Sequence, residues 1–208
     1  MNINAILRLT DIFVALCSEE QPDNSKDLKK ILKNIENLDT FIARKKYLNK
    51  NLKNLAHGSS RIVYLTKNNT VIKLAKNARG VAQNKSEANP KMKSKFLNKI
   101  LNHAKDFLWV ESPFVEKTTM AEFKDISGID FNDFCDSISY VLSSDDKPNN
   151  FDDIKTSSIF KEVKRIGKRF KLLPGDLKKI SSWGKNKNQL VLIDFGLTKS
   201  IFSKLYER

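Results

Sequence analysis

LVLIDFG, at residues 190–196, decides how this sequence is interpreted, because four consecutive apolar residues lead directly into an aspartate. An unbroken apolar run of this length, bounded by turn residues, predicts a buried β-strand. Asp194 would then stand where the strand ends, and Gly196 would let the backbone turn sharply after it. A carboxylate in that position can hold Mg²⁺ against phosphate oxygens.

A second acidic candidate, Asp176, lies 18 residues earlier in the loop PGDLKKISSWG, at residues 174–184. A carboxylate in a loop can accept a proton from an attacking hydroxyl group. Ser181 and Ser182 follow in the same loop. A serine hydroxyl is a neutral oxygen donor and binds a metal more weakly than an amide carbonyl does.

A β-hairpin is predicted further toward the N-terminus, where β-rich runs at 62–66 and 70–74 flank the turn residues 67–69. Lys73 alternates with apolar neighbours and therefore points to the opposite face of its strand. Glu87 follows 14 residues later in a helix-compatible segment. Taken alone, each of the two also fits an ordinary surface residue.

The turn before this hairpin is a candidate phosphate-binding loop. The segment 56–63 reads AHGSSRIV and contains Gly58, Ser59 and Ser60. Backbone N–H groups and serine hydroxyls in such a turn can bind phosphate oxygens. A plain β-turn explains the same residues equally well.

The order of these features resembles the protein-kinase superfamily over about three quarters of the chain. The phrases LAHGSSRIVYL, LPGDLKKISSWG and LVLIDFGLT are similar to the small kinase-like proteins encoded by tailed bacteriophages. The resemblance implies an α+β, two-lobed protein-kinase-like fold with a truncated C-terminal lobe and an N-terminal helical appendage. It implies binding of ATP and Mg²⁺ and phosphoryl transfer to a protein or small-molecule hydroxyl.

The resemblance also implies a role for each candidate. Lys73 would bind the α- and β-phosphates, oriented by Glu87, and Asp176 would be catalytic. Gly58, Ser59 and Ser60 would bind phosphate. Val63 and the backbone near Glu111 would contact the adenine. Asp194 would bind metal together with Ser181 or Ser182.

Four departures from the family pattern favour alternatives. Only Gly58 remains of three usual glycines, no His-Arg pair precedes Asp176, and serine replaces the second metal-binding asparagine. Only 12 residues follow Gly196, which leaves no room for an activation segment or a peptide platform. A catalytically weak pseudokinase or interaction module is therefore the alternative to an ATP-dependent kinase.

Hydrophobic periodicity divides the chain into three segments. They are a helical appendage at 1–54, an N-lobe at 55–117 and a shortened, mostly helical C-lobe at 118–208. Within them we predict helices at 1–16, within 25–54, within 82–105, at 119–142 and at 154–171, and strands at 107–110, broken by 111–113, and at 189–194.

Composition bounds the remaining possibilities. A third interpretation follows from the net charge of +14, because lysine and arginine side chains neutralise nucleic-acid phosphates. In this interpretation the chain is a basic nucleic-acid-binding protein that uses Lys-rich stretches at 26–53 and 161–171. Only seven of the 38 basic residues are arginine, which is the better reader of bases. No apolar run is long enough for a membrane span, and no signal peptide is evident, so we expect a cytoplasmic protein, in a bacterial host if phage-encoded.

Overall fold

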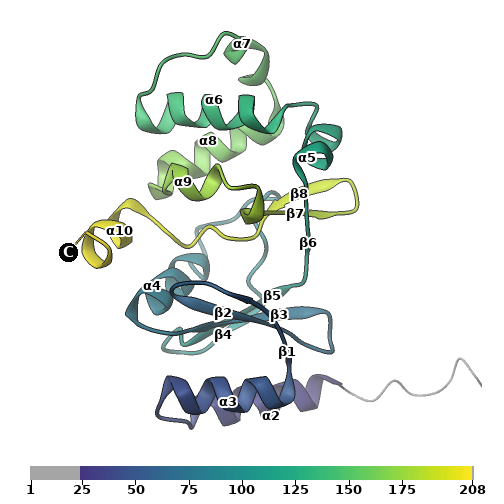
Figure 1. Ribbon diagram of the computed structural model, residues 1–208, viewed down its shortest axis with the longest axis vertical. Coiled ribbons are helices and arrows are strands. Elements are labelled where there is room, and N and C mark those ends of the chain that lie inside the picture. The colour runs from purple at the N-terminus through teal and green to yellow at the C-terminus, as the bar shows by residue number, and fades with distance from the viewer. Residues whose placement is uncertain (1–23, 208) are drawn as a thin grey trace, which may run out of the picture.

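The computed structural model describes residues 24–207, which form an α+β structure with an antiparallel sheet and a mostly helical part (Figure 1). The helix predicted at 1–16 lies outside the described residues. Within them, no helix combines the length and apolar character needed to cross a membrane. The elements are α2 (Asn24–Glu36), α3 (Phe41–Asn51), β1 (Lys53–His57), β2 (Arg61–Leu65), β3 (Thr70–Ala75), α4 (Ala78–Glu87), β4 (Asn102–His103), β5 (Trp109–Pro113), β6 (Glu116–Lys117), α5 (Met120–Ser127), α6 (Phe131–Ser143), α7 (Phe151–Ile154), α8 (Ser158–Phe170), α9 (Pro174–Leu177), the 3₁₀ turn η1 (Ile180–Ser182), β7 (Trp183–Asn186), β8 (Gln189–Leu192) and α10 (Lys199–Leu205).

The larger sheet has five antiparallel strands in the order β1-β2-β3-β5-β4. The predicted hairpin is confirmed as β2 and β3, with Val63 opposite Lys73. Because side chains alternate along a strand, the two faces of this hairpin have different partners. One face packs on helices, and the other carries Arg61, Val63, Val71 and Lys73 into a cavity.

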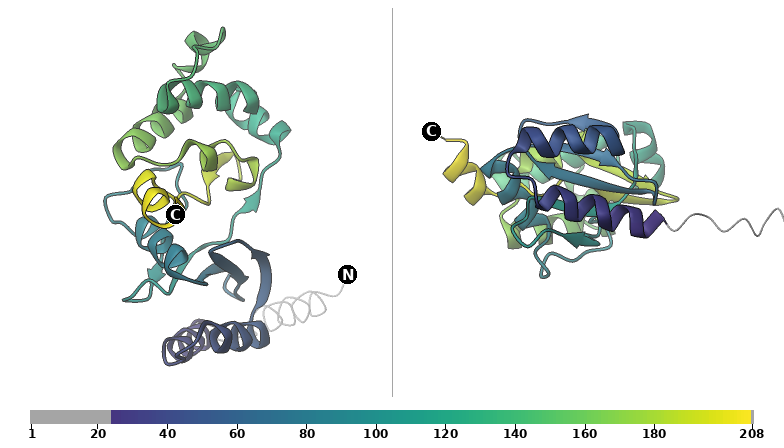
Figure 2. Two further views of the ribbon diagram at one scale, coloured as in Figure 1. Left: turned by 60° about the vertical axis from the view of Figure 1, so that its left-hand side comes forward. Right: turned by 90° about the horizontal axis from the view of Figure 1, so that it is seen from below.

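Helices α2 and α3 lie side by side across one face of this sheet (Figure 2). Apolar side chains from both helices and from β2, β3 and β5 form one core. Trp109 is buried in this core, and its indole N–H donates a hydrogen bond to the Glu36 carboxylate at 3.1 Å. The helices thus cover the sheet face that would otherwise expose the core residues Ile62, Tyr64, Ile72 and Leu74.

A second core fills the helical part, where α5, α6 and α8 lie on one side of the small sheet β6-β7-β8 (Figure 1). Trp183, Phe123 and Phe134 are fully buried and meet largely edge to face, which adds to the stability gained from burial. The predicted C-terminal strand is confirmed as β8. It ends at Leu192, two residues before Asp194.

Two long predicted helices are in fact pairs of helices, because local capping interrupts each periodic run. Gly128 ends α5 in the left-handed conformation, and Asp130 then caps α6. Likewise, Thr40 caps α3 and separates it from α2. Hydrophobic periodicity continues through such breaks, since a cap changes the direction of the chain without changing its apolar spacing.

Three other predicted boundaries are wrong. The helix expected within 82–105 covers only residues 78–87, and the following segment, which contains Pro90, is irregular. The predicted helix at 154–171 begins at 158, where Ser157 supplies the N-cap. β5 continues through the predicted break at 111–113, because Pro113 closes the strand at its end and its missing N–H costs no internal ladder bond.

Candidate functional site

A cavity of about 640 Å³ lies between the larger sheet and the helical part. Its walls come from the turn at 58–60, from β2 and β3, from the segment after β5, and from residues 176–197. The lining is not uniform. At one end, Val71 lies near Pro113 and Phe114, whereas at the other end Arg61 and Lys73 face acidic residues. An apolar end joined to a charged end suits a ligand with an aromatic base and a phosphate chain.

The structure brings Lys73 and Glu87 together, the pair that the sequence predicted. The Lys73 ammonium donates to Glu87 Oε2 at 2.7 Å and to the Ile193 carbonyl at 2.6 Å. Glu87 lies at the end of α4 with a side chain 0% exposed. Burial lowers the pKa of Lys73, although the Glu87 carboxylate opposes this shift.

Arg61, which the sequence analysis did not single out, links Glu87 to Asp194. Its Nη1 lies 2.9 Å from Glu87 Oε1, and its Nη2 lies 2.6 Å from Asp194 Oδ1. Burial would lower the pKa of Arg61, but the two carboxylates outweigh it and raise the pKa. The local signal was its place directly before the predicted strand 62–66, two residues from Val63 and therefore on the same strand face.

Asp194 is surrounded by cations. Burial would raise its pKa, but Arg61, Lys73 and Lys179 together lower it. Its side chain is 51% exposed, so the ion pair with Arg61 borders the cavity and is not enclosed in the core. The carboxylate is therefore charged and already partnered.

Asp176 also lines the cavity, at α9, and the structure places it near Asp194. Lys179 donates to its Oδ1 at 2.8 Å. Burial raises the pKa of Asp176, and the Asp194 charge adds to the shift, while Lys179 opposes it. A carboxylate with a raised pKa is a stronger base, as proton abstraction from a hydroxyl requires.

The predicted phosphate loop borders the cavity through Gly58, Ser59 and Ser60. The Gly58 N–H is taken by the Arg61 carbonyl at 2.9 Å. The Ser60 hydroxyl donates to Gln83 of α4 at 3.1 Å. The bond from Ser60 fixes the turn to α4.

Two predicted ligands do not reach the cavity. The Glu111 carbonyl accepts from Leu101, and its carboxylate accepts from Thr70 at 2.8 Å, so Glu111 belongs to the sheet. The cavity wall is instead formed by the residues just after it, beginning at Pro113. Ser182 is buried in η1, whereas its neighbour Ser181 does line the cavity.

Gly196 is needed for a different reason from the predicted sharp turn. A Cβ at this position would lie 2.7 Å from the Gln83 carbonyl and 2.9 Å from its Cβ. The absence of a side chain lets the segment after Asp194 pass directly against α4. The C-terminal helix α10 continues along α4, where Tyr206 accepts a hydrogen bond from Gln83 at 2.8 Å and stacks under Arg79.

The donor set does not fit a magnesium ion. Of the predicted ligands, only Asp194 and Ser181 border the cavity, and Asp194 Oδ1 is held by Arg61. Mg²⁺ binds through carboxylate oxygens that are free to coordinate it, and here Arg61, Lys73 and Lys179 already offset the charge of the carboxylates at this end of the cavity. Among residues 24–207, no group of three His, Cys, Asp or Glu side chains is arranged to hold a metal.

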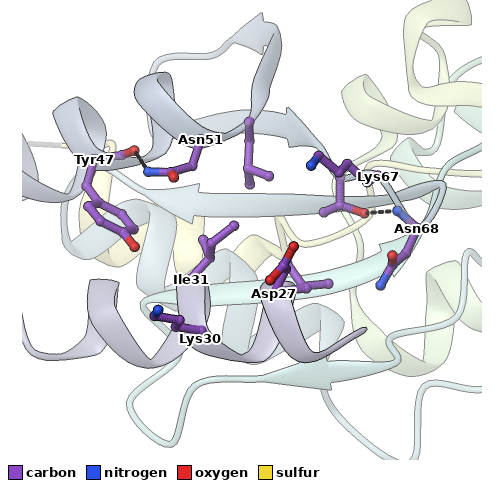
Figure 3. A pocket seen from close by; sticks show the side chains of 10 residues that line it. Asp27, Lys30, Ile31, Tyr47, Asn51, Lys67 and Asn68 are labelled. Carbon is purple, nitrogen blue, oxygen red and sulfur yellow. Dashed lines mark hydrogen bonds between the residues drawn. The ribbon is translucent and has the colours of Figure 1, made fainter. Parts of the chain in front are cut away.

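A smaller cavity of about 310 Å³ lies between α2, α3 and the β2–β3 turn (Figure 3). Asp27, Tyr47 and Lys67 line it, and Asn51 donates to the Tyr47 carbonyl at 2.7 Å. None of the residues predicted to be functional lies there. The candidate site is therefore the 640 Å³ cavity, which most of the predicted residues line.

Comparisons with known proteins add a likeness of fold alone. No protein-family model matches the sequence, and no curated protein matches it. Among solved structures, the streptomycin-ATP-APH(2")-IIa ternary complex is similar over 76% of this chain and 71% of that chain, with 15% identity and a TM-score of 0.35. At this TM-score the similarity supports no functional conclusion, so function has to be inferred from the geometry of the site.

Proposed function

We propose that this chain is a kinase-like protein that binds ATP in the 640 Å³ cavity, between an N-lobe at 55–117 and a C-lobe at 118–208. The observation that carries the proposal is Lys73, a buried ammonium at the cavity wall, held by Glu87 and the Ile193 carbonyl. A preorganised ammonium beside a cavity is an anchor for phosphate oxygens. The apolar end of the cavity would take the base.

Calorimetric titration with ATP tests this proposal. Lys73→Ala should weaken binding by about 10- to 150-fold, since a hydrogen bond to a charged group contributes about 1.5–3 kcal/mol. The matched control is Lys67→Ala, which removes an exposed lysine from the turn of the same hairpin. Equal affinities for the two variants, or no ATP binding by the wild type, would contradict the proposal.

Phosphoryl transfer is a second candidate function, favoured by Asp176. Its carboxylate would accept the proton of an acceptor hydroxyl. The hydroxyl oxygen would bond to the γ-phosphorus, the bond from that phosphorus to the β–γ bridging oxygen would break, and ADP would leave. Lys73 and Arg61 would stabilise the charge that develops on the phosphoryl oxygens.

Radiolabelled ATP distinguishes transfer from binding alone. Asp176→Asn should abolish labelling of hydroxyl acceptors while ATP remains bound, because the amide cannot take the proton. If the wild type labels neither itself nor protein or small-molecule acceptors, the chain is a nucleotide-binding module without transferase activity.

A further inference from the structure

Arg61 lies at the centre of the charged end of the cavity. Besides its contacts with Glu87 and Asp194, its Nη1 donates to Asn84 Oδ1 at 3.3 Å. This carboxamide in turn donates to the Lys73 carbonyl at 3.3 Å. The guanidinium is thus fixed by side chains from α4 and from the segment after β8, and it still lines the cavity.

The charges around it balance before any nucleotide binds. The predicted set of Lys73, Glu87, Asp176 and Asp194 carries one positive and three negative charges, which a divalent cation would neutralise. Arg61 and Lys179 both lie within 3 Å of carboxylate oxygens in this set and bring two positive charges. The six side chains therefore balance without a metal.

We propose that Arg61 takes the electrostatic place of a divalent cation, so that the cavity binds the phosphates of a nucleoside di- or triphosphate without Mg²⁺. The inference rests on the proposed nucleotide binding and specifies its ionic requirement. A guanidinium suits this place because its planar donors can hold carboxylate and phosphate oxygens together. In this ion pair the Arg61 side chain is 7% exposed and the Asp194 side chain 51% exposed, so the pair opens toward the cavity on its carboxylate side.

The test is calorimetric titration of the full chain with ATP in excess EDTA and again in excess MgCl₂. For the wild type, the two values of Kd should agree within about threefold. Arg61→Gln removes the charge and should create a need for a cation, so that MgCl₂ tightens binding by at least about tenfold. Arg165→Gln is the matched control, since this arginine pairs with Glu162 outside the cavity, and its ratio should equal that of the wild type.

A second variant keeps the inference testable if Arg61→Gln does not fold. Asp194→Asn frees the guanidinium for phosphate and removes a repelling charge, so ATP affinity in EDTA should rise by about threefold or more. A metal-dependent site predicts the opposite, because Asp194 would be its principal ligand.

The outcomes separate the two proposals. Wild-type binding that weakens tenfold or more in EDTA (~1.4 kcal/mol) overturns the role of Arg61 and leaves nucleotide binding intact. Loss of ATP binding in Asp194→Asn overturns it as well. Absence of wild-type binding under both conditions overturns the proposed function, and the ionic requirement with it.

Discussion

The buried carboxylate of Glu87 gives the sharpest prediction about stability. It accepts from Lys73 at 2.7 Å and from Arg61 at 2.9 Å, and the Phe195 N–H approaches it at 3.4 Å. Glu87→Gln keeps the size of the side chain and removes its charge. Two buried cations then lose their shared counter-ion, although Asp194 still pairs with Arg61.

Removing one partner of a buried ion pair costs about 3–5 kcal/mol, because the other charge is left desolvated. We expect Glu87→Gln to lower the free energy of unfolding by this amount. At about 2–4 °C per kcal/mol for a chain of this size, Tm should fall by roughly 6–20 °C. Urea denaturation followed by circular dichroism measures the change, and a constant m-value would show that the unfolded state is unaffected.

The matched control is Glu162→Gln. Glu162 pairs with Arg165 at 2.6 Å, but both side chains are partly exposed, 24% and 45% respectively. Such pairs contribute about 0–1 kcal/mol, because water screens the charges. If Glu87→Gln costs no more than Glu162→Gln, the buried network around Glu87 does not stabilise the fold.

Two further predictions concern close packing and pH. Gly196→Ala should destabilise the fold by about 1–3 kcal/mol, because its Cβ would overlap Gln83, whereas Gly175→Ala, with no atom within 4 Å of the added Cβ, should be tolerated; urea denaturation compares them. Hydrogen bonding from Lys185 lowers the pKa of Glu122 from 4.5 to about 2, so its stabilising effect is present above pH 4.5 and is lost as the pH falls toward 2. Glu122→Gln, which can still cap α5, should therefore lose less stability than the wild type over that range in thermal melts at each pH, and equal losses would contradict this assignment.

Short-range sequence patterns were sufficient to predict the strands β2, β3 and β8. Alternation in the runs that became β2 and β3 predicted their pairing and placed Lys73 on the face opposite the apolar core, as found. The apolar run of LVLIDFG predicted β8, because a strand of four consecutive apolar residues has apolar side chains on both faces and is stable only where both faces are buried. Glu87 was identified as the partner of Lys73 because the resemblance supplied the order of the motifs.

Only the tertiary structure decided the charge balance of the site. Arg61 and Asp194 are 133 residues apart, and no periodicity or local motif connects residues at that separation. The exclusion of Glu111 and Ser182 from the cavity has the same cause, because burial depends on which elements pack together. The sequence by itself predicted a lysine, a glutamate and two aspartates in one site. Lys179 is a local neighbour, three residues from Asp176. The fold added Arg61 to that site, because side chains distant in sequence are brought within Coulomb range only when the sheet closes on the helical part.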